Sequence, residues 1–446
     1  MRNSQELVHI LLIAIAGACL FRAPGQAQQP VATKLPQNIH AQAARSIEDL
    51  NLVGAETSMP PFMESPIDIN SAFRRNLLSR GLALRGNAKT QYTQNTMQAP
   101  VNADQQSYVG QRPFDTSFVT WTLTSDLRQL ALSQAQLYVS GVWNWASWNP
   151  AGPKTLQLYG LYFYKSFVER RVEIKAGYIC NDLEVIGMSV GGSAASSAQG
   201  IYAVLPFEAG LSFLPLASPS FNLRVQGPSS IYLKALAQRS IDADGGPREI
   251  ARNHTGFRFL PGGDKLLLFG ETGYKREASA DNNESWYRAG YMRNSTPYAH
   301  LATGKPGSGN HFAFALMDQQ ILKSNVLRPS QGLYLGGTAM AADSHYDAYS
   351  TYYELRLYKK APFASRPFDM ASLVSYYSGH SSYLTNRLAA SGKTVWRASA
   401  AVTGSYSMRV KPGQFMSIGL GYTRGAAITP RVGDALCLSA SYAFYF

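Results

Sequence analysis

Apolar and polar side chains alternate with a period of two over much of the chain after Gly81. The clearest case is residues 396–410, WRASAAVTGSYSMRV, where alternate positions are apolar or aromatic and the others are basic, hydroxylic or small. Successive side chains of a β-strand point to opposite faces. The pattern therefore predicts strands with one apolar and one polar face, and it recurs more loosely over residues 134–145, 171–178 and 349–360.

Composition decides what such strands build. A soluble β-sandwich also alternates, but the chain has 26 Tyr and 20 Phe, many of them near strand ends, and only 15% charged residues. Its mean hydropathy is −0.16, and no apolar run of about 18 residues follows the N-terminus, which excludes helical membrane spans. We expect an all-β fold, a transmembrane antiparallel β-barrel of the bacterial outer membrane that encloses a water-filled pore for small polar solutes.

The strand count has to be even, because both ends of such a barrel lie on the periplasmic side. Placing strands one by one gives about 17, so we expect sixteen, with eighteen as the alternative. Two motifs predict tight periplasmic turns, Lys411–Gly413 and Pro261–Asp264. Counting from the N-terminus places the second turn in the periplasm, whereas counting back from Phe446 places it outside. We assign the error to residues 276–394, around the irregular stretch 294–310.

The N-terminal region has the pattern of an export signal. Residues 1–27 combine Arg2, an apolar stretch over residues 8–21, and small residues before a cleavage site after Ala27. A lipoprotein box at residues 16–19 is the alternative, although its usual leucine is missing. We expect residues 28–67 to form a partly disordered periplasmic extension. Residues 68–446 form the barrel, which begins with a short helix over 70–80 that Gly81 terminates.

The last segment, LCLSASYAFYF, alternates up to Phe446. It resembles the C-terminal insertion signal of outer-membrane barrels, which implies recognition by the barrel-assembly machinery. An ordinary edge strand is the alternative, but so flat and apolar an edge would invite aggregation in a soluble protein.

The formal net charge of +13 comes without a basic run. Basic residues recur at inward strand positions, so we expect a basic lumen or contacts with anionic lipopolysaccharide rather than nucleic-acid binding. Cys19 falls in the signal; Cys180 and Cys437 are expected to be unpaired, with a disulfide between them as the alternative. Metal-ligand spacings and phosphate-binding loops are missing from the sequence, and no cofactor is expected.

One motif suggests an enzyme instead. Residues 187–191, GMSVG, fit the G-x-S-x-G pattern of a serine hydrolase. That motif needs a strand before it and an apolar helix after it, whereas GGSAASSAQG is typical of a loop. Strand phasing places no histidine opposite an inward serine. An outer-membrane barrel hydrolase therefore remains a remote alternative, and we expect that the protein is not an enzyme.

Several segments resemble one porin family. They are FRRNLLSRGLAL (73–84), YGLYFYKSFVERRVEIKAGYICND (159–182), YRAGY (287–291), MDQQIL (317–322) with Gly332-Leu333, and YYELRLYKKAPF (352–363) with Pro367. In this order they are similar to the carbohydrate-selective porins of the OprB type over residues 70–446. The resemblance implies a barrel, commonly of sixteen strands, through which monosaccharides such as glucose diffuse. It leaves open whether the protein is a monomer or a trimer.

Strand phasing also predicts which side chains line the pore. The inward cations are Arg85, Lys89, Arg171, Lys175, Lys275, Arg356, Arg397 and Arg409. The opposing carboxylates are Glu173, Glu271 and Glu354, and the inward aromatic candidates are Tyr138, Tyr352 and Tyr358. The segment 180–200 follows the fifth strand and is expected to fold into the pore, with Asp182 and Glu184 at the constriction.

Such a ring could select solutes in two ways. Opposed cations and carboxylates bind sugar hydroxyls and aromatic faces stack on pyranose rings, which favours small sugars. A predominantly basic lumen would instead give a general or anion-selective porin. For any single residue, an ordinary salt bridge on the barrel wall is the alternative to solute binding.

Overall fold

The structure is a computed structural model that describes residues 72–148, 154–185, 204–213, 215–260, 262 and 264–446. Sixteen antiparallel strands form a closed barrel in which each strand pairs with its neighbours in sequence and β1 pairs with β16. The expectation of sixteen strands is therefore confirmed. The strands are β1 Leu82–Asn95, β2 Phe114–Asp126, β3 Ala135–Ala146, β4 Thr155–Phe167, β5 Val172–Ile179, β6 Ser218–Gln226, β7 Ile231–Arg239, β8 Leu266–Arg276, β9 Ser285–Asn294, β10 Asn310–Lys323, β11 Gly332–Ala342, β12 Tyr349–Lys360, β13 Met370–His380, β14 Ala398–Lys411, β15 Gln414–Arg424 and β16 Ala435–Tyr445.

The helices are short. They are α3 Ala72–Ser79, α4 Asp182–Val185, α6 Val204–Glu208, α7 Gly246–Arg252 and α8 Ser382–Ala390, with 3₁₀ turns η1 Ala103–Gln105 and η2 Leu127–Leu130. No helix within the described ranges has the length and hydropathy needed to cross a membrane. The helix predicted before the first strand is α3, and Gly81 follows it with φ of +71°, the left-handed conformation that ends helices.

The two-faced strand pattern is clearest in β12. Tyr352 and Arg356 are each 1% exposed, whereas Tyr353 and Leu355, on alternate positions, are each 54% exposed. The exposed set faces outward and is apolar or aromatic, and the buried set faces the lumen and is polar or charged. This is the arrangement that a barrel wall between lipid and water requires.

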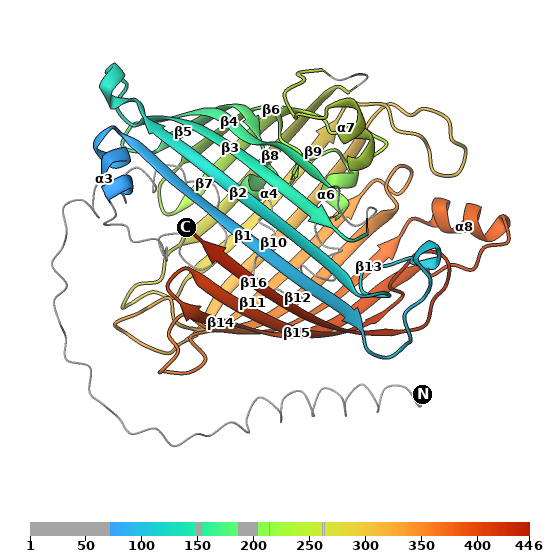
Figure 1. Ribbon diagram of the computed structural model, residues 1–446. Helices are drawn as coiled ribbons and strands as arrows, with labels where there is room; N and C mark the ends of the chain where they lie inside the picture. The colour runs from blue at the N-terminus through green and yellow to red at the C-terminus, as the bar shows by residue number, and fades with distance from the viewer. Residues whose placement is uncertain (1–71, 149–153, 186–203, 214, 261, 263) are drawn as a thin grey trace. The chain divides into compact units, whose positions relative to one another are not determined.

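The first and last strands close the barrel at one end. Phe446 and Gly86 exchange backbone hydrogen bonds, with N···O distances of 2.7 and 2.9 Å. The ring of Phe446 occupies the space where a Cβ at position 86 would stand, so glycine is required there. β16 is thus a paired strand rather than an edge. Figure 1 shows the C-terminus at the end of the barrel where α3 lies, which we take as the periplasmic end.

Most short turns lie at this periplasmic end. Pro412 and Gly413 alone separate β14 from β15, and Gly413 has φ of +68°. The second predicted turn is different: Gly262 and Asp264 belong to the long segment that joins β7 to β8 at the opposite, external end. The prediction of a tight periplasmic turn there is wrong. The count back from Phe446 was right, and the miscount lies before residue 261, not in 276–394. A glycine-rich sequence indicates a bend in the chain, but it does not show how long the connecting segment around that bend is.

Candidate functional site

Between β5 and β6, residues 180–185 and 204–213 fold into the barrel; the rest of the predicted pore segment 180–200, from residue 186 on, lies outside the described residues. Three lumen-facing cations from different strands hold α4. Lys175 of β5 pairs with the Glu184 carboxylate at 2.5 Å, and Lys234 of β7 donates to the Glu184 carbonyl at 3.1 Å. Arg288 of β9 donates to the Val185 carbonyl at 2.7 Å. Because these cations lie on lumen faces, α4 stands inside the ring of strands, as Figure 1 shows.

A buried amide network fixes the start of this segment. The Asn181 amide nitrogen donates to Gln238 at 2.7 Å and to Ser220 at 3.0 Å. Its amide oxygen accepts from Asn222 at 2.7 Å. Asn181 is fully buried, so these bonds to β6 and β7 satisfy polar groups that would otherwise be costly to bury.

The later part of the segment packs through apolar side chains. Leu205 and Leu211, on and just after α6, are fully buried against lumen-facing residues of β8 to β12 such as Phe312 and Phe314. This side of the lumen is therefore filled. The opposite wall, on β1 and β14 to β16, presents small polar side chains inward, among them Thr93, Ser417 and Ser441.

A partly buried carboxylate attaches α6 to the start of β12. The Glu208 carboxylate accepts a hydrogen bond from the Tyr349 backbone N–H at 3.0 Å. Burial raises the pKa of Glu208 to about 7, although backbone N–H groups of Ala348 and Tyr349 oppose the shift. Burial and the charge of Glu208 also raise the pKa of Asp347 well above its usual range.

Aromatic faces and cations meet on the wall formed by β1 and β3 to β5. The rings of Tyr138 and Tyr162 stack with centroids 4.4 Å apart and an interplanar angle of 16°. The Lys175 ammonium lies 5.5 Å from the Tyr162 ring. Arg85 is on the lumen face of β1, and its Nη1 is buried without a hydrogen-bond partner among the described residues. We call Arg85, Tyr138, Tyr162, Lys175 and Glu184 the lumen ledge.

Two carboxylates continue the ledge around the wall. Glu173 accepts from the Tyr164 hydroxyl at 2.8 Å and pairs with Arg224 at 3.2 Å. Glu271 accepts from the Tyr232 hydroxyl at 2.7 Å, with the Lys234 ammonium 3.7 Å away. Along β5 to β8 the two carboxylates thus flank two cations, Arg224 and Lys234, so this wall offers both hydrogen-bond donors and acceptors to a polar solute.

Comparisons with known proteins agree with this architecture. The chain is similar to the high-pH structure of Pseudomonas putida OprB, with a TM-score of 0.69, 13% identity, and coverage of 84% of this chain and 96% of that chain. For the low-pH structure the TM-score is 0.55 at 12% identity, over 87% and 100%. For Salmonella typhi OmpF in complex with daunomycin it is 0.52 at 8%, over 82% and 99%.

Sequence comparison decides the family. No curated protein sequence matches the chain. The sequence model described as carbohydrate-selective porin, OprB family, matches residues 83–440. The chain belongs to the OprB family. This OprB-family porin is a passive carbohydrate channel of the bacterial outer membrane, and its family and fold indicate a channel rather than an enzyme.

Some of the predicted pore residues come together at α4. They are Arg85, Tyr138, Glu173, Lys175, Glu184 and Glu271. Lys89 lies on the lumen face of β1 between Arg85 and Gln91 and forms no ion pair with the described residues. Asp182 is buried at the start of α4. Burial of the Cys180 thiol, together with the negative charge of Asp182, raises the pKa of that thiol. Neither Cys180 nor Cys437 forms a disulfide, as expected.

A second group faces the lumen but is internally paired. Arg356 is fully buried and binds Glu354, Asp318 at 3.2 Å, and the Thr338 hydroxyl at 2.6 Å. The Tyr352 hydroxyl also binds Glu354, and Tyr358 donates to Asp318 at 3.0 Å. For these residues the ordinary wall salt bridge fits the geometry better than solute binding.

Four predicted cations lie away from α4 and the lumen ledge. Arg171 is exposed in the turn before β5, and Arg397 is exposed just before β14, so neither is a strand residue. Arg409 stands at the periplasmic end of β14, 4.3 Å from the Phe368 ring. Lys275, near the periplasmic end of β8, pairs with Glu277 at 3.3 Å. For Arg171 and Arg397 the phasing extends past strand ends, where side-chain alternation no longer holds.

Sequence reasoning missed several lumen residues and one pairing. Tyr162, Arg224, Lys234 and Arg288 all occupy alternate positions of strands, and extending the phasing to β4, β6, β7 and β9 would have found them. The expectation that no histidine meets an inward serine is wrong. The imidazole Nε2 of His380 lies 3.1 Å from the Ser399 hydroxyl. That hydroxyl is buried and also bonded to the Gly425 carbonyl, so the pair joins β13, β14 and the segment after β15.

Proposed function

We propose that this porin passes monosaccharides such as glucose, and polar solutes of similar size, along the lumen ledge. The observation that supports the proposal most is Arg85, which is only partly buried on the lumen face and whose Nη1 has no hydrogen-bond partner among the described residues. It lies on the same lumen wall as a stacked tyrosine pair and the Lys175–Glu184 ion pair. A sugar hydroxyl can accept from Arg85 while the apolar face of the ring lies against Tyr138.

Passage by this route needs no chemical step. Each contact with the ledge replaces a hydrogen bond to water, so the net gain per bond is only about 1 kcal/mol. Weak, successive contacts favour entry without trapping the solute, as conduction requires. The motif at residues 187–191 lies outside the described residues, and we propose no catalytic role.

Block of single-channel current by glucose tests the proposal. Arg85→Gln removes the free donor, and a loss of about 1 kcal/mol corresponds to roughly a fivefold weaker apparent affinity for glucose. Arg397→Gln is the matched control, because it removes one cation at an exposed position outside the lumen ledge. If glucose does not block the unmodified channel, or if both variants bind glucose equally well, the ledge is not the sugar path.

A second candidate is an anion-selective pore, and one observation favours it. Around α4 the lumen cations outnumber the carboxylates, so the field at the lumen ledge is positive. The cations are Arg85, Lys89, Lys175, Arg224, Lys234 and Arg288, and the carboxylates are Glu173, Asp182, Glu184 and Glu271. The reversal potential in a KCl gradient separates the two: strong anion preference without sugar block supports this candidate.

The regions around the barrel have proposed roles too. Residues 1–27 are the export signal, residues 28–67 a periplasmic extension, and β16 the element that the barrel-assembly machinery recognises. Mass measurement of the mature N-terminus tests the first. Membrane insertion of a chain that lacks Phe446 tests the last. Native mass spectrometry decides between monomer and trimer.

A further inference from the structure

The outer face of β6 to β9 is hollowed. Two adjoining depressions there have volumes of about 640 and 430 Å³. They share four lining residues, so they form one continuous groove on the outside of the wall. We call it the outer-wall groove. Its outward lining residues include Leu223, Ala235, Ala237, Gly270, Ala289 and Tyr291. Small side chains make the floor: a Cβ added at Gly270 would meet no atom within 4 Å.

The external segment between β7 and β8 extends the groove outward. This segment covers the outer face, because the Tyr178 hydroxyl of β5 donates to the Phe257 carbonyl at 2.6 Å. A third depression of about 460 Å³ is lined by Phe259, Leu260 and Phe221, and it shares Phe221 and Ala237 with the groove. Phe259 and Leu260 are 64% and 67% exposed. Exposed apolar side chains on a membrane-facing loop indicate contact with lipid.

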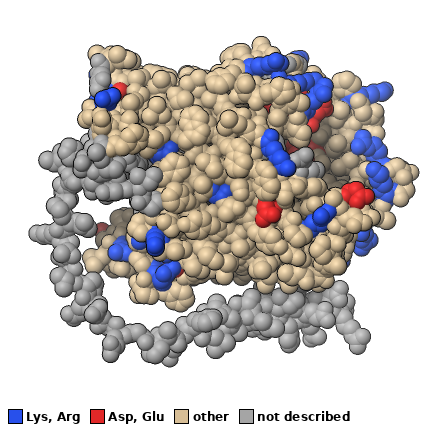
Figure 2. Space-filling view, in the orientation of Figure 1, with Lys and Arg blue, Asp and Glu red and all other residues tan. Residues whose placement is uncertain are grey.

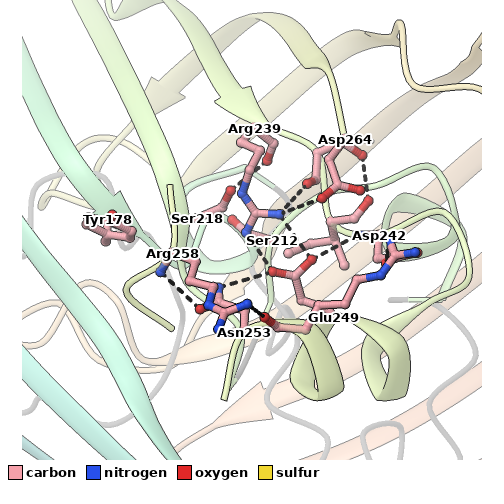
Figure 3. Close-up of polar contacts among 12 residues, drawn as sticks. Tyr178, Ser212, Ser218, Arg239, Asp242, Glu249, Asn253, Arg258 and Asp264 are labelled. Atoms are coloured by element: carbon pink, nitrogen blue, oxygen red, sulfur yellow. Dashed lines mark hydrogen bonds and ion pairs between the residues drawn. The ribbon is translucent and has the colours of Figure 1, made fainter. Parts of the chain in front are cut away.

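A buried ion network holds this segment in place, as Figure 3 shows. The guanidinium of Arg239, at the end of β7, binds Glu249 of α7 at 2.6 Å and Asp264 at 3.3 Å. Arg252 pairs with Asp242 at 2.6 Å. The external end of the groove is therefore a built feature with a defined position relative to β7 and β8.

Two cations lie at that external end. Lys265 lines the third depression and Arg293 lines the groove, and both are exposed. Neither forms an ion pair with any carboxylate in the described part of the chain. Asp264 is turned to Arg239, and Asp343, beside His311, accepts from His345 at 2.8 Å. Figure 2 shows Lys and Arg side chains at both ends of the barrel, including the end where α7 and α8 lie, while the face of the wall in view is mostly uncharged between the ends.

The length of the groove matches one leaflet. Together with the third depression, the groove follows β8 from Leu266 to Thr272, and over these residues the chain advances about 20 Å at roughly 3.4 Å per residue. With strands tilted by about 40°, this is about 15 Å of depth. The hydrocarbon core is about 30 Å thick, so the groove runs from the external surface to about the midplane.

We propose that the outer-wall groove binds an acyl chain of an anionic outer-leaflet glycolipid of the lipid A type, whose phosphate lies at Lys265 and Arg293. Charge and depth both fit: the cations stand at headgroup level and the apolar floor begins directly below them. A second copy of the chain fits less well. In a two-fold contact each patch faces itself, which would bring Lys265 and Arg293 against the same cations.

The charge part of the proposal is tested on the purified, folded barrel in detergent. Native mass spectrometry measures binding of hexa-acylated lipid A and of dioleoyl phosphatidylcholine. The double variant Lys265→Gln, Arg293→Gln should bind lipid A about tenfold more weakly and phosphatidylcholine unchanged, since two cations that contact a phosphate are lost. Arg424→Gln is the control, an exposed cation at the external end of β15, and should bind like the unmodified protein.

The shape part uses a matched pair of glycines. Gly270→Leu fills the groove, whereas Gly404→Leu adds the same side chain to the outer face of β14, where a new Cβ also meets no atom within 4 Å. Bound lipid A should fall at least fivefold in the first variant and stay constant in the second. Equal losses in both, or unchanged lipid A binding in the Lys265 and Arg293 variant, overturn the proposal. A dimer mass abolished by Gly270→Leu would instead identify a second copy as the occupant.

Discussion

The ion pair between Lys175 and Glu184 permits a prediction with a defined sign. Its atoms are 2.5 Å apart, and the two side chains are 5% and 14% exposed. At an effective dielectric constant of about 20, unit charges about 4 Å apart attract by about 4 kcal/mol. Desolvation and the water of the lumen offset most of this, so we expect a coupling of about 1–3 kcal/mol in a double-mutant cycle.

Glu184→Gln removes one negative charge and leaves the Lys175 ammonium uncompensated in the lumen. The main-chain contacts of α4 with Lys234 and Arg288 remain, so we expect the segment to stay inside the barrel. The pore should become more anion-selective, because the freed cation attracts anions. Lys175→Gln should shift selectivity toward cations, and the double variant should return close to the unmodified protein.

Reversal potentials in a KCl gradient across a planar bilayer measure all four proteins. Opposite shifts for the two single variants, cancelling in the double variant, are the expected result. The reasoning is refuted if both single variants shift the potential in the same direction, or if Glu184→Gln leaves it unchanged. Glucose block recorded in the same experiment shows whether the pair also contributes to sugar binding.

Glu208, Arg239 and Gly86 each support a further prediction. Glu208, with a pKa raised from 4.5 to about 7, holds a proton that the unfolded chain releases at lower pH, so its contribution to stability is full below pH 4.5 and is lost as the pH rises through 7. Closing events in single-channel records should therefore increase from pH 5.5 to 8, and Glu208→Gln should abolish this increase; a variant with the same pH profile contradicts the assignment. Arg239→Met leaves the carboxylates of Glu249 and Asp264 buried without their cation, which costs about 3–5 kcal/mol. Limited proteolysis should then cut the segment between β7 and β8 first, and cleavage at the unmodified rate would speak against the network. Gly86→Val forces a side chain into the space of the Phe446 ring; overpacking of this kind costs about 1–3 kcal/mol and should lower the thermal midpoint, whereas an unchanged midpoint would show that the seam adapts.

Much of the fold could be predicted from local pattern. In β12 the alternation of Tyr352, Glu354 and Arg356 with Tyr353 and Leu355 identified the lumen and lipid faces correctly. The even strand number followed from membrane topology. The pattern failed where the feature depends on more of the chain than the pattern covers. Gly262 and Asp264 belong to a long external segment rather than a tight turn, and Arg171 and Arg397 lie beyond the strand ends.

Only part of the candidate site could be predicted from this alternation. Alternation placed both Lys175 and Arg356 on the lumen face. It could not show that Arg356 forms an ion pair with Asp318 of another strand, whereas Lys175 forms one with Glu184 of α4. Those partners are set by strand register and by where the segment after β5 settles. The direction of a side chain depends on its position within one strand, so the local amino-acid sequence determines it. The identity of a neighbour across the lumen depends on closure of the whole barrel, and only the tertiary structure decides it.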